Sequence, residues 1–195
     1  MIILKRLFLL VLTVLSLFSC KKDLRLFDKD PKTFLTEYGK ENPENEVVIK
    51  TVGGDITIKL YDKTPLHRAN FIRLVKSNYY IHRTFYRNVY LTAIQGGGEY
   101  EDQLDYLVPP EYFPELVHKR GAIAMARYDE GNPEKASSPT EFFIVTNANE
   151  AQKLNGLYVV FGEVIKGMDV VDKIQQAPEY YEKPVIPVFF RIEMP

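Results

Sequence analysis

The sequence has one cysteine, no tryptophan and almost no net charge, and these absences exclude several classes of protein. With Cys20 alone, no intramolecular disulfide can form, so a disulfide-stapled secreted scaffold is excluded. A formal net charge of -1 over 195 residues provides no basic field, so we expect no nucleic-acid partner. The hydrophobic content of 46% is too high for a disordered chain and is typical of a folded domain.

The motifs of common catalytic and metal sites are also missing. The three histidines, His67, His82 and His118, are scattered along the chain without the spacing of metal ligands. The sequence has no Gly-x-Ser-x-Gly motif and no phosphate-binding P-loop, and no cysteine follows Cys20. We therefore expect neither a metal site nor a covalent nucleophile of these kinds.

The first twenty residues differ from the rest of the chain. Lys5 and Arg6 precede an apolar run from Leu7 to Phe18, a signal-peptide pattern that is shorter than the ~20 residues needed to span a bilayer. The run ends in "LFSC", which resembles the lipobox of bacterial lipoproteins, in which the cysteine carries the lipid after cleavage. The resemblance implies a signal peptide over 1–19, a lipidated Cys20 and a protein anchored on a membrane of the bacterial cell envelope, facing the periplasm or the surface. The alternative is an uncleaved anchor with a free thiol.

The residues from 20 to 45 are expected to form a tether and a short helix before one domain over 46–195. Lys21 to Asp30 is charged and polar, which is typical of a tether. Asp30 followed by Pro31 is an N-cap pattern, so we predict a helix from Pro31 to about Tyr38 that ends at Gly39.

Short β-patterned runs and two helical ones make up the expected domain. Two strands flank the turn at 52–55, Thr64 is expected to cap a helix that begins at Pro65, and Gly167 begins a second helix. The remaining strands are predicted at Thr84–Val89, Leu91–Gln95, Gly121–Arg127, Glu141–Thr146, Leu157–Val164 and over 184–194. Many short strands with two helices favour a closed antiparallel β-barrel whose open ends the helices cover.

The order of five segments is specific to one family. The segments "GDITIKLYDKTPLHRANFIRLV", "TFYRNVYLTAIQGGG", "GAIAMAR", "SSPTEFFIV" and "LYVVFGEVIKGMDVVDKI" together resemble the cyclophilin-type peptidyl-prolyl isomerases over about Val47 to Ile192. The resemblance implies a mainly β fold, a closed eight-stranded antiparallel barrel capped by two α-helices. It also implies an enzyme that needs no cofactor and speeds rotation about X–Pro bonds in proline-containing polypeptides, here unfolded or partly folded exported proteins.

Arg87 is a cation in the middle of a strand-like aromatic run, and the resemblance explains it. In the family an arginine at this position projects into a groove on the outer face of the barrel. The X–Pro bond resists rotation because resonance gives it partial double-bond character, with a barrier of ~18–20 kcal/mol. The twisted amide loses this conjugation and its nitrogen regains a lone pair, so a guanidinium beside it binds the twisted form better than the planar one. By resemblance Arg87 is the catalytic residue; the alternative is a surface arginine that packs its stem on a neighbour.

Eight further positions are expected to contact the substrate by resemblance. They are Phe143, Gln95, Thr92, Ala93, Glu141, Ala126, Leu154 and Tyr158. Phe143 would form the floor of the proline pocket and Leu154 and Tyr158 its walls, and Ala126 would line the groove. Gln95 and Glu141 would contact the peptide backbone.

Some of these positions depart from the family pattern. Thr92 and Ala93 replace a large aromatic residue and a methionine, and each apolar side chain of that size contributes ~1.5–3 kcal/mol when buried. Glu141 replaces a glutamine, and its carboxylate could pair with Arg87 across the groove. These departures leave open a peptide-binding module with little or no isomerase activity. A purely structural envelope lipoprotein is a third alternative.

Overall fold

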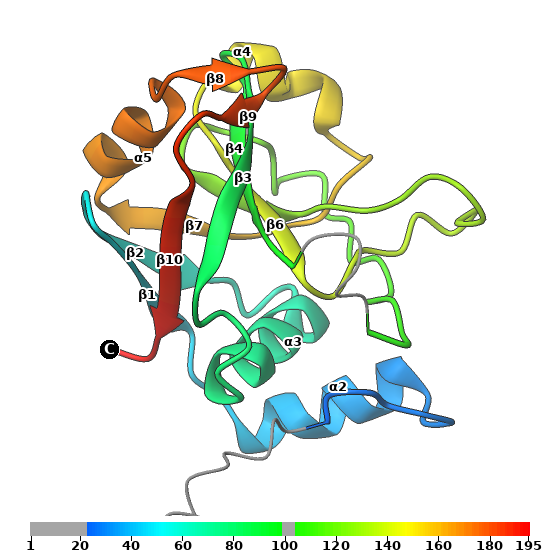
Figure 1. The fold of residues 1–195 in the computed structure, drawn as a ribbon. Coiled ribbons are helices and arrows are strands. Elements are labelled where there is room, and N and C mark those ends of the chain that lie inside the picture. The colour runs from blue at the N-terminus through cyan, green and yellow to red at the C-terminus, as the bar shows by residue number, and fades with distance from the viewer. Residues whose placement is uncertain (1–22, 99–103) are drawn as a thin grey trace, which may run out of the picture.

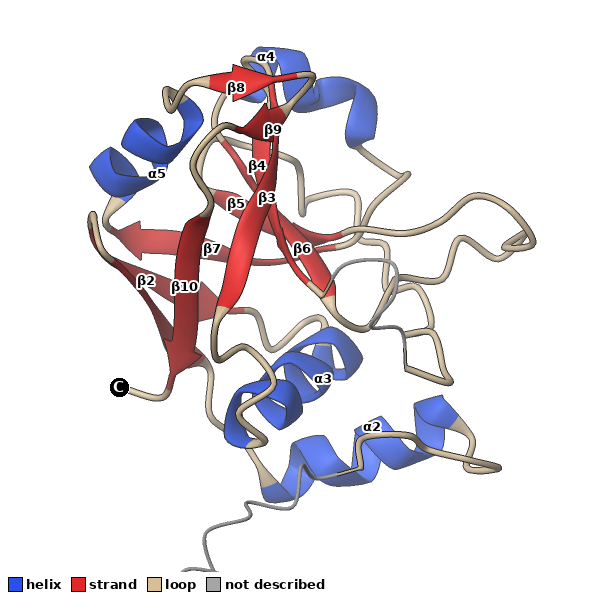
Figure 2. Ribbon diagram, in the orientation of Figure 1, coloured by secondary structure: helices blue, strands red, loops and turns tan. Residues whose placement is uncertain are grey.

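Eight antiparallel strands form a closed barrel in the computed structural model, which describes residues 23–98 and 104–195 (Figures 1 and 2). The predicted signal peptide and Cys20 lie outside the described residues. The strand order is β1-β10-β3-β4-β6-β5-β7-β2. The strands are β1 (Glu46–Thr51), β2 (Gly54–Leu60), β3 (Arg83–Val89), β4 (Ala93–Gly97), β5 (Ala122–Met125), β6 (Glu141–Val145), β7 (Val160–Lys166) and β10 (Val188–Glu193). A separate hairpin pairs β8 (Glu179–Tyr180) with β9 (Lys183–Pro184).

Two helices cover the barrel, as the sequence predicts. Figure 1 shows α3 (Pro65–Lys76) beneath the barrel and α5 (Met168–Gln175) beside the opposite part of it. Their apolar faces join the barrel core, α3 through Phe71 and Leu74 and α5 through Val171. The described residues also contain α2 (Pro31–Glu41), the short α4 (Ala148–Ala151) and the 3₁₀ helix η2 (Gln152–Leu154). None of these helices is both long and apolar enough to cross a membrane.

Aromatic rings fill the centre of the barrel. Phe142 on β6 meets Phe71 edge-on at 5.6 Å between ring centroids, and it also contacts Tyr80, Phe85 and Phe190. Because successive side chains of a strand point to opposite faces, the inward position of Phe142 turns Phe143 outward. The sequence "EFFI" therefore supplies one core residue and one residue for the outer face.

The predicted end of the first helix at Tyr38 and Gly39 is wrong. The helix α2 continues to Glu41, and Gly39 is buried inside it. A Cβ on Gly39 would lie 3.1 Å from the Cβ of Ala69 on α3, so the missing side chain lets the two helices approach closely. The glycine therefore serves packing rather than helix termination.

The described part of the predicted tether packs against α3 instead of extending freely. Leu24 and Leu26 are buried, and Arg73 of α3 donates from Nη2 to the carbonyl oxygen of Leu24 at 2.9 Å. The Asp105 carboxylate accepts the backbone N–H groups of Leu26 at 2.8 Å and Phe27 at 2.7 Å. The two leucines bury apolar surface that the charged composition of the segment conceals.

The hydroxyl of Thr64 does not cap α3 as predicted. It donates to the Tyr61 carbonyl oxygen at 3.4 Å and makes no capping hydrogen bond. The free N–H groups of Leu66 and His67 are accepted instead by the Glu111 carboxylate, at 3.1 and 3.0 Å. A carboxylate from a distant loop thus satisfies the helix N-terminus, where negative charge is stabilising.

Candidate active site

A bulge in β3 turns Arg87 to the outside of the barrel. Phe85 points into the core, so strict alternation would point residue 87 inward too. The pairing of β3 with β4 shifts register between Phe85 and Arg87, and bulges re-aim side chains in this way. Asn88 takes the inward position at 1% exposure, whereas the Arg87 side chain is 47% exposed.

Three neighbouring strands place the central site residues in one row. Arg87 on β3 pairs with Gln95 on β4, and Gln95 pairs with Phe143 on β6. Residues directly opposite one another in antiparallel strands have Cβ atoms about 4.5–5.5 Å apart. A cation, an amide and an apolar ring therefore lie side by side on the outer face of the barrel.

A cavity of about 230 Å³ opens beside this row. Eight of the nine residues expected at the site line it: Arg87, Thr92, Ala93, Gln95, Ala126, Phe143, Leu154 and Tyr158. Phe143 forms an apolar floor, and Tyr158 meets it edge-on at 5.6 Å between centroids. The adjoining hollow that a catalytic role for Arg87 requires is thus present. Glu141 is the expected residue that does not line this cavity.

Glu141 lines a second cavity, of about 420 Å³, which it shares with Arg87 and Gln95, and it does not pair with Arg87. Its side chain is among the buried polar ones, at 4% residue exposure. Its Oε2 accepts the hydroxyl of Tyr86 at 2.7 Å and the Gln95 amide at 3.1 Å, and its Oε1 accepts the hydroxyl of Tyr128. Burial, followed by the charge of Glu141, raises the pKa of Tyr86 far above its usual value, so this phenol remains a donor.

The carboxylate of Glu141 fixes the orientation of Gln95. Because a carboxylate can only accept, the Gln95 Nε2 must face Glu141, and Nε2 also donates to Tyr86 Oη at 2.7 Å. The Gln95 Oε1 then faces the other way, where Arg87 Nη1 donates to it at 3.3 Å. The substitution of glutamate for the family glutamine thus contributes to the position of Arg87 through Gln95 rather than by direct pairing.

The acidic partner of Arg87 is Glu182, which the sequence analysis missed. Arg87 Nε donates to Glu182 Oε2 at 2.7 Å. The two residues are 95 positions apart, and Glu182 lies in a polar stretch with no motif, so no local signal pointed to it. Of the five N–H donors of the guanidinium, three have no partner among the described residues.

His118 packs against Phe143 and was also missed by the sequence analysis. Its ring lies parallel to that of Phe143, and its Nδ1 and backbone N both lie 2.8 Å from Asn155 Oδ1. Nδ1 is therefore the protonated nitrogen, since an amide oxygen only accepts. Nε2 is buried and has no partner among the described residues, and burial lowers the pKa of His118.

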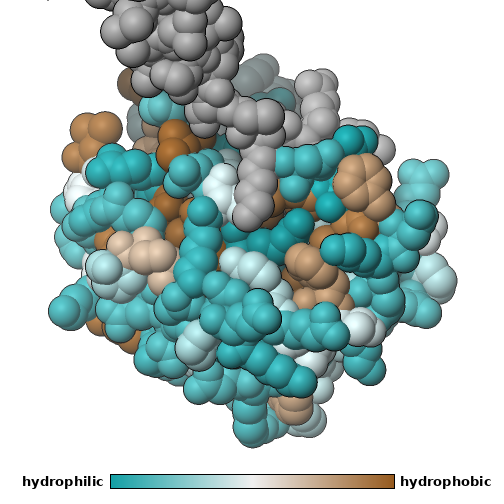
Figure 3. All heavy atoms as spheres, turned by 90° about the horizontal axis from the view of Figure 1, so that it is seen from below, coloured by the Kyte–Doolittle hydropathy of each residue, from teal (hydrophilic) through white to brown (hydrophobic). Residues whose placement is uncertain are grey.

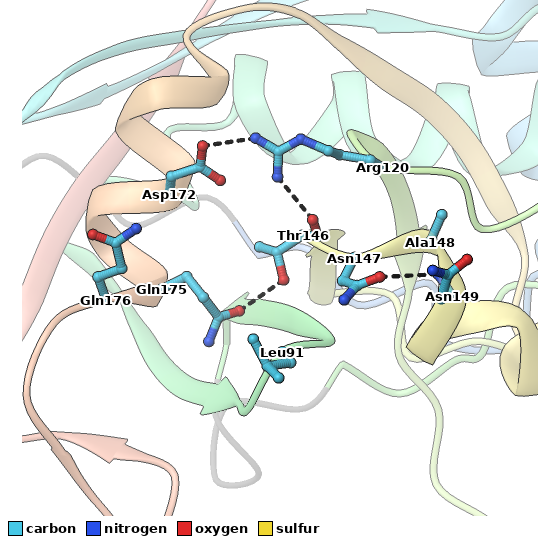
Figure 4. Close-up of a pocket in the computed structure, with 9 residues that line it drawn as sticks. All are labelled: Leu91, Arg120, Thr146, Asn147, Ala148, Asn149, Asp172, Gln175 and Gln176. Atoms are coloured by element: carbon cyan, nitrogen blue, oxygen red, sulfur yellow. Dashed lines mark hydrogen bonds and ion pairs between the residues drawn. The ribbon is translucent and has the colours of Figure 1, made fainter.

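A larger cavity, of about 440 Å³, lies away from Arg87 between α4 and α5 (Figure 4). Its polar groups are largely paired with one another: Arg120 binds Asp172 at 2.6 Å and the Thr146 carbonyl oxygen at 2.8 Å. Thr146 Oγ1 lies 2.9 Å from Gln175 Oε1. This cavity has no apolar floor like Phe143 and no free cation, so size alone does not make it the site. Within 23–98 and 104–195, no cluster of histidine, aspartate and glutamate side chains is suited to hold a metal.

Comparisons with known proteins agree with this geometry. The family model "Cyclophilin type peptidyl-prolyl cis-trans isomerase/CLD" matches residues 46–192. A peptidyl-prolyl cis-trans isomerase of Acinetobacter baylyi is 40% identical over 140 residues, which cover 68% of this chain and 72% of that protein. Peptidyl-prolyl cis-trans isomerase A of Dickeya dadantii is 37% identical over 139 residues, which cover 67% of this chain and 70% of that protein.

Solved structures give the same result. A cyclophilin-type isomerase of Cryptosporidium parvum superposes with a TM-score of 0.69 at 28% identity, over 76% of this chain and 96% of that one. The same protein in the presence of the dipeptide Ala-Pro gives a TM-score of 0.68 at 29% identity, over 76% and 98% of the two chains. The chain therefore belongs to the cyclophilin-type peptidyl-prolyl cis-trans isomerases.

Proposed function

We propose that this isomerase acts on X–Pro bonds of exported polypeptides, with Arg87 as the catalytic residue. The observation that carries the proposal is the position of Arg87 at the rim of a cavity floored by Phe143, with three guanidinium N–H donors free of partners among the described residues. An apolar floor beside a fixed cation suits a proline ring joined to an amide that must twist.

The reaction makes and breaks no covalent bond, so catalysis consists of binding the twisted amide better than the planar one. The proline ring packs on Phe143 with Leu154 and Tyr158 at its sides, which holds one end of the bond. The rest of the peptide then rotates, and the guanidinium of Arg87 donates to the nitrogen lone pair that conjugation no longer occupies. This step transfers no proton and needs no cofactor.

The surrounding network keeps Arg87 ready for this role. Gln95 Oε1 accepts from Nη1 and Glu182 Oε2 accepts from Nε, so two different nitrogens of one planar group are held. A group that is oriented before substrate binds pays no reorganisation cost in the transition state. Thr92 and Ala93 line the cavity with small side chains, so they offer a proline ring less apolar contact than larger residues would.

Exchange NMR on an Ala-Pro peptide tests the proposal, with the chain from Lys21 onward so that the packed segment before α2 is kept. We expect this protein to speed cis–trans exchange and Arg87→Ala to remove about 99% of the acceleration, the usual cost of one transition-state donor. Arg191→Ala, an exposed arginine on β10, is the matched control and should change nothing. Peptide binding without acceleration by the unmutated chain would support the binding-module alternative and refute the isomerase on such peptides.

We further propose that Cys20 carries a lipid and holds the protein on a membrane of the bacterial envelope. The support is the "LFSC" pattern and the apolar run before it. Each lipid CH₂ buried in the membrane contributes ~0.8 kcal/mol, so stable anchoring needs more than one chain. Metabolic labelling with palmitate should be lost in Cys20→Ala, and continued labelling of that variant would refute lipidation at this cysteine.

A further inference from the structure

The turn between β8 and β9 has an unusual backbone. Its two central residues, Tyr181 and Glu182, have φ angles of 49° and 63°. Two-residue hairpin turns with positive φ at both positions favour asparagine and glycine, and neither is present. Side chains with a Cβ persist in this region only where their surroundings hold them, and such strain is concentrated at functional sites.

Two contacts hold Glu182 against β3. Its backbone carbonyl accepts the N–H of Asn88 at 2.7 Å, and its carboxylate accepts Arg87 Nε at 2.7 Å. Asn88 is itself anchored, because its Nδ2 donates to the Ile174 carbonyl at 2.9 Å. Both ends of Glu182 are therefore tied to consecutive residues of the strand that carries the catalytic arginine.

Glu182 contacts Arg87 from a second cavity and not from the groove beside Phe143. Arg87 and Gln95 line both the groove cavity and a second one of about 420 Å³, and Glu182 lines only the second. The bond to Glu182 occupies Nε, and the bond to Gln95 occupies one hydrogen of Nη1. The remaining N–H groups stay available to the first cavity.

We propose that Glu182 is a positioning residue that holds the Arg87 guanidinium at the angle required for isomerisation. The inference rests on the proposed function of Arg87. A single ion pair at the surface contributes little to folding, and the two side chains here are 47% and 42% exposed. An unrestrained arginine, by contrast, has many rotamers. A bond to Glu182 in addition to the bond to Gln95 restricts these rotamers and so orients the guanidinium.

The negative charge of Glu182 does not cancel the catalytic charge. The guanidinium remains ionised in any protein environment. Water reaches both partners, so their mutual attraction is screened and leaves most of the field on the groove side. The benefit of orienting the Arg87 guanidinium therefore exceeds the loss from partly neutralising its charge, and removal of Glu182 lowers isomerase activity.

The test compares two substitutions by exchange NMR and steady-state kinetics. Glu182→Ala removes the bond to Arg87 Nε, and we expect kcat to fall about five- to tenfold with KM changed less than about twofold. This loss is smaller than the roughly 10²-fold loss that a 1 Å misplacement of a catalytic group can cause, because Gln95 still holds Arg87. Glu182→Gln keeps an oxygen that accepts from Nε without the charge, so activity within about twofold of the unmutated protein is expected. Glu179→Ala, an exposed carboxylate of the same hairpin, is the matched control.

A structural readout accompanies the kinetics. The Arg87 Nε–H resonance, assigned by its loss in Arg87→Ala, should be shifted and protected in the unmutated protein and in Glu182→Gln, and should move to the free-arginine position in Glu182→Ala. Protection of the Asn88 amide from hydrogen exchange reports whether the hairpin remains in place.

Three outcomes would overturn the inference: no change in Glu182→Ala, an equal loss in both Glu182 variants, or a gain in both. The last would mean that the carboxylate masks Arg87. If the unmutated chain gave no acceleration, the proposed function would fail, but the Arg87 Nε–H resonance would still decide whether Glu182 orients this side chain.

Discussion

The imidazole of His118 lies parallel to the phenyl ring of Phe143, with 5.8 Å between centroids and 8° between planes. Phe143, the floor of the proposed proline pocket, thus packs against a second ring that is itself buried. His118 is 2% exposed, and its Nε2 has no acceptor among the described residues. Burial therefore favours the neutral imidazole, because a proton on Nε2 would be a buried donor without a partner.

The buried imidazole of His118 makes the free energy of unfolding depend on pH. The pKa of His118 is lowered by burial from 6.5, so below about pH 6.5 the unfolded chain binds a proton that the folded chain excludes. The free energy of unfolding then falls with decreasing pH, by up to about 1.4 kcal/mol per unit from this group, and is fully retained above pH 6.5.

Urea unfolding from pH 7.5 to 5 of the unmutated protein and His118→Phe measures this effect. The phenylalanine keeps a ring packed against Phe143 but cannot titrate, so the difference between the two slopes isolates His118. Equal slopes would contradict a lowered pKa.

Thr92→Phe should raise activity by enlarging the pocket wall. Thr92 lines the groove cavity, and its hydroxyl donates only to the exposed turn at Tyr90. If about half of the ~1.5–3 kcal/mol of a buried aromatic side chain acts on the transition state, kcat/KM rises roughly fivefold. Thr92→Val, which removes the hydroxyl without adding a ring, is the control. A fall in activity with folding intact would show a groove shaped for another ligand.

Glu141→Gln should destabilise the protein even though glutamine is the family residue. The carboxylate receives donors from Tyr86, Tyr128 and Gln95, and an amide would turn its own donor toward one of them. A buried donor left without an acceptor costs about 1–3 kcal/mol, measurable by urea unfolding. Adding Tyr128→Phe removes a competing donor and should recover part of the loss. An unchanged stability of Glu141→Gln alone would contradict this account.

Gly39→Leu should separate α2 from α3 without affecting catalysis. The new side chain would begin 3.1 Å from Ala69 Cβ and 3.7 Å from the Pro65 carbonyl oxygen, so the helices must move apart. Overpacking of this kind costs about 1–3 kcal/mol. Glu37→Leu, on an exposed position of the same helix, is the matched control. A drop in isomerase activity equal to that of Arg87→Ala would show unexpected coupling between the two ends of the molecule.

The sequence predicts those parts of the molecule that depend on local pattern. The alternation in "EFFI" and the helix that begins at Pro65 are readable from neighbouring residues, and the barrel follows from the number of short strands. The outward direction of Arg87 could be stated only by resemblance, because it depends on a bulge that periodicity does not reveal.

Partners that are distant along the chain could not be predicted from the sequence, and the reason is physical. Glu182, His118 and Glu111 act on residues between 25 and 95 positions away, and such contacts form only when the barrel closes. The pairing of Arg87 with Glu141, which the sequence left open, does not occur, and the reason is again long-range. Two tyrosines and Gln95 saturate that carboxylate, and none of these contacts lies between residues close enough in sequence to be inferred.

Because Leu24 and Leu26 are buried near α3, only a few residues separate Cys20 from the folded domain. From position 20 to Asp23, a fully extended chain reaches at most about 11 Å. If Cys20 carries a lipid as proposed, this short connection holds the barrel close to the lipid headgroups of the membrane. The end that carries α2 and α3, whose visible surface is mostly hydrophilic with scattered apolar spots (Figure 3), would then face them. Figure 1 places the β8–β9 hairpin and α4 at the opposite end. Arriving chains would then meet Arg87 from the aqueous side, with the bilayer behind the enzyme.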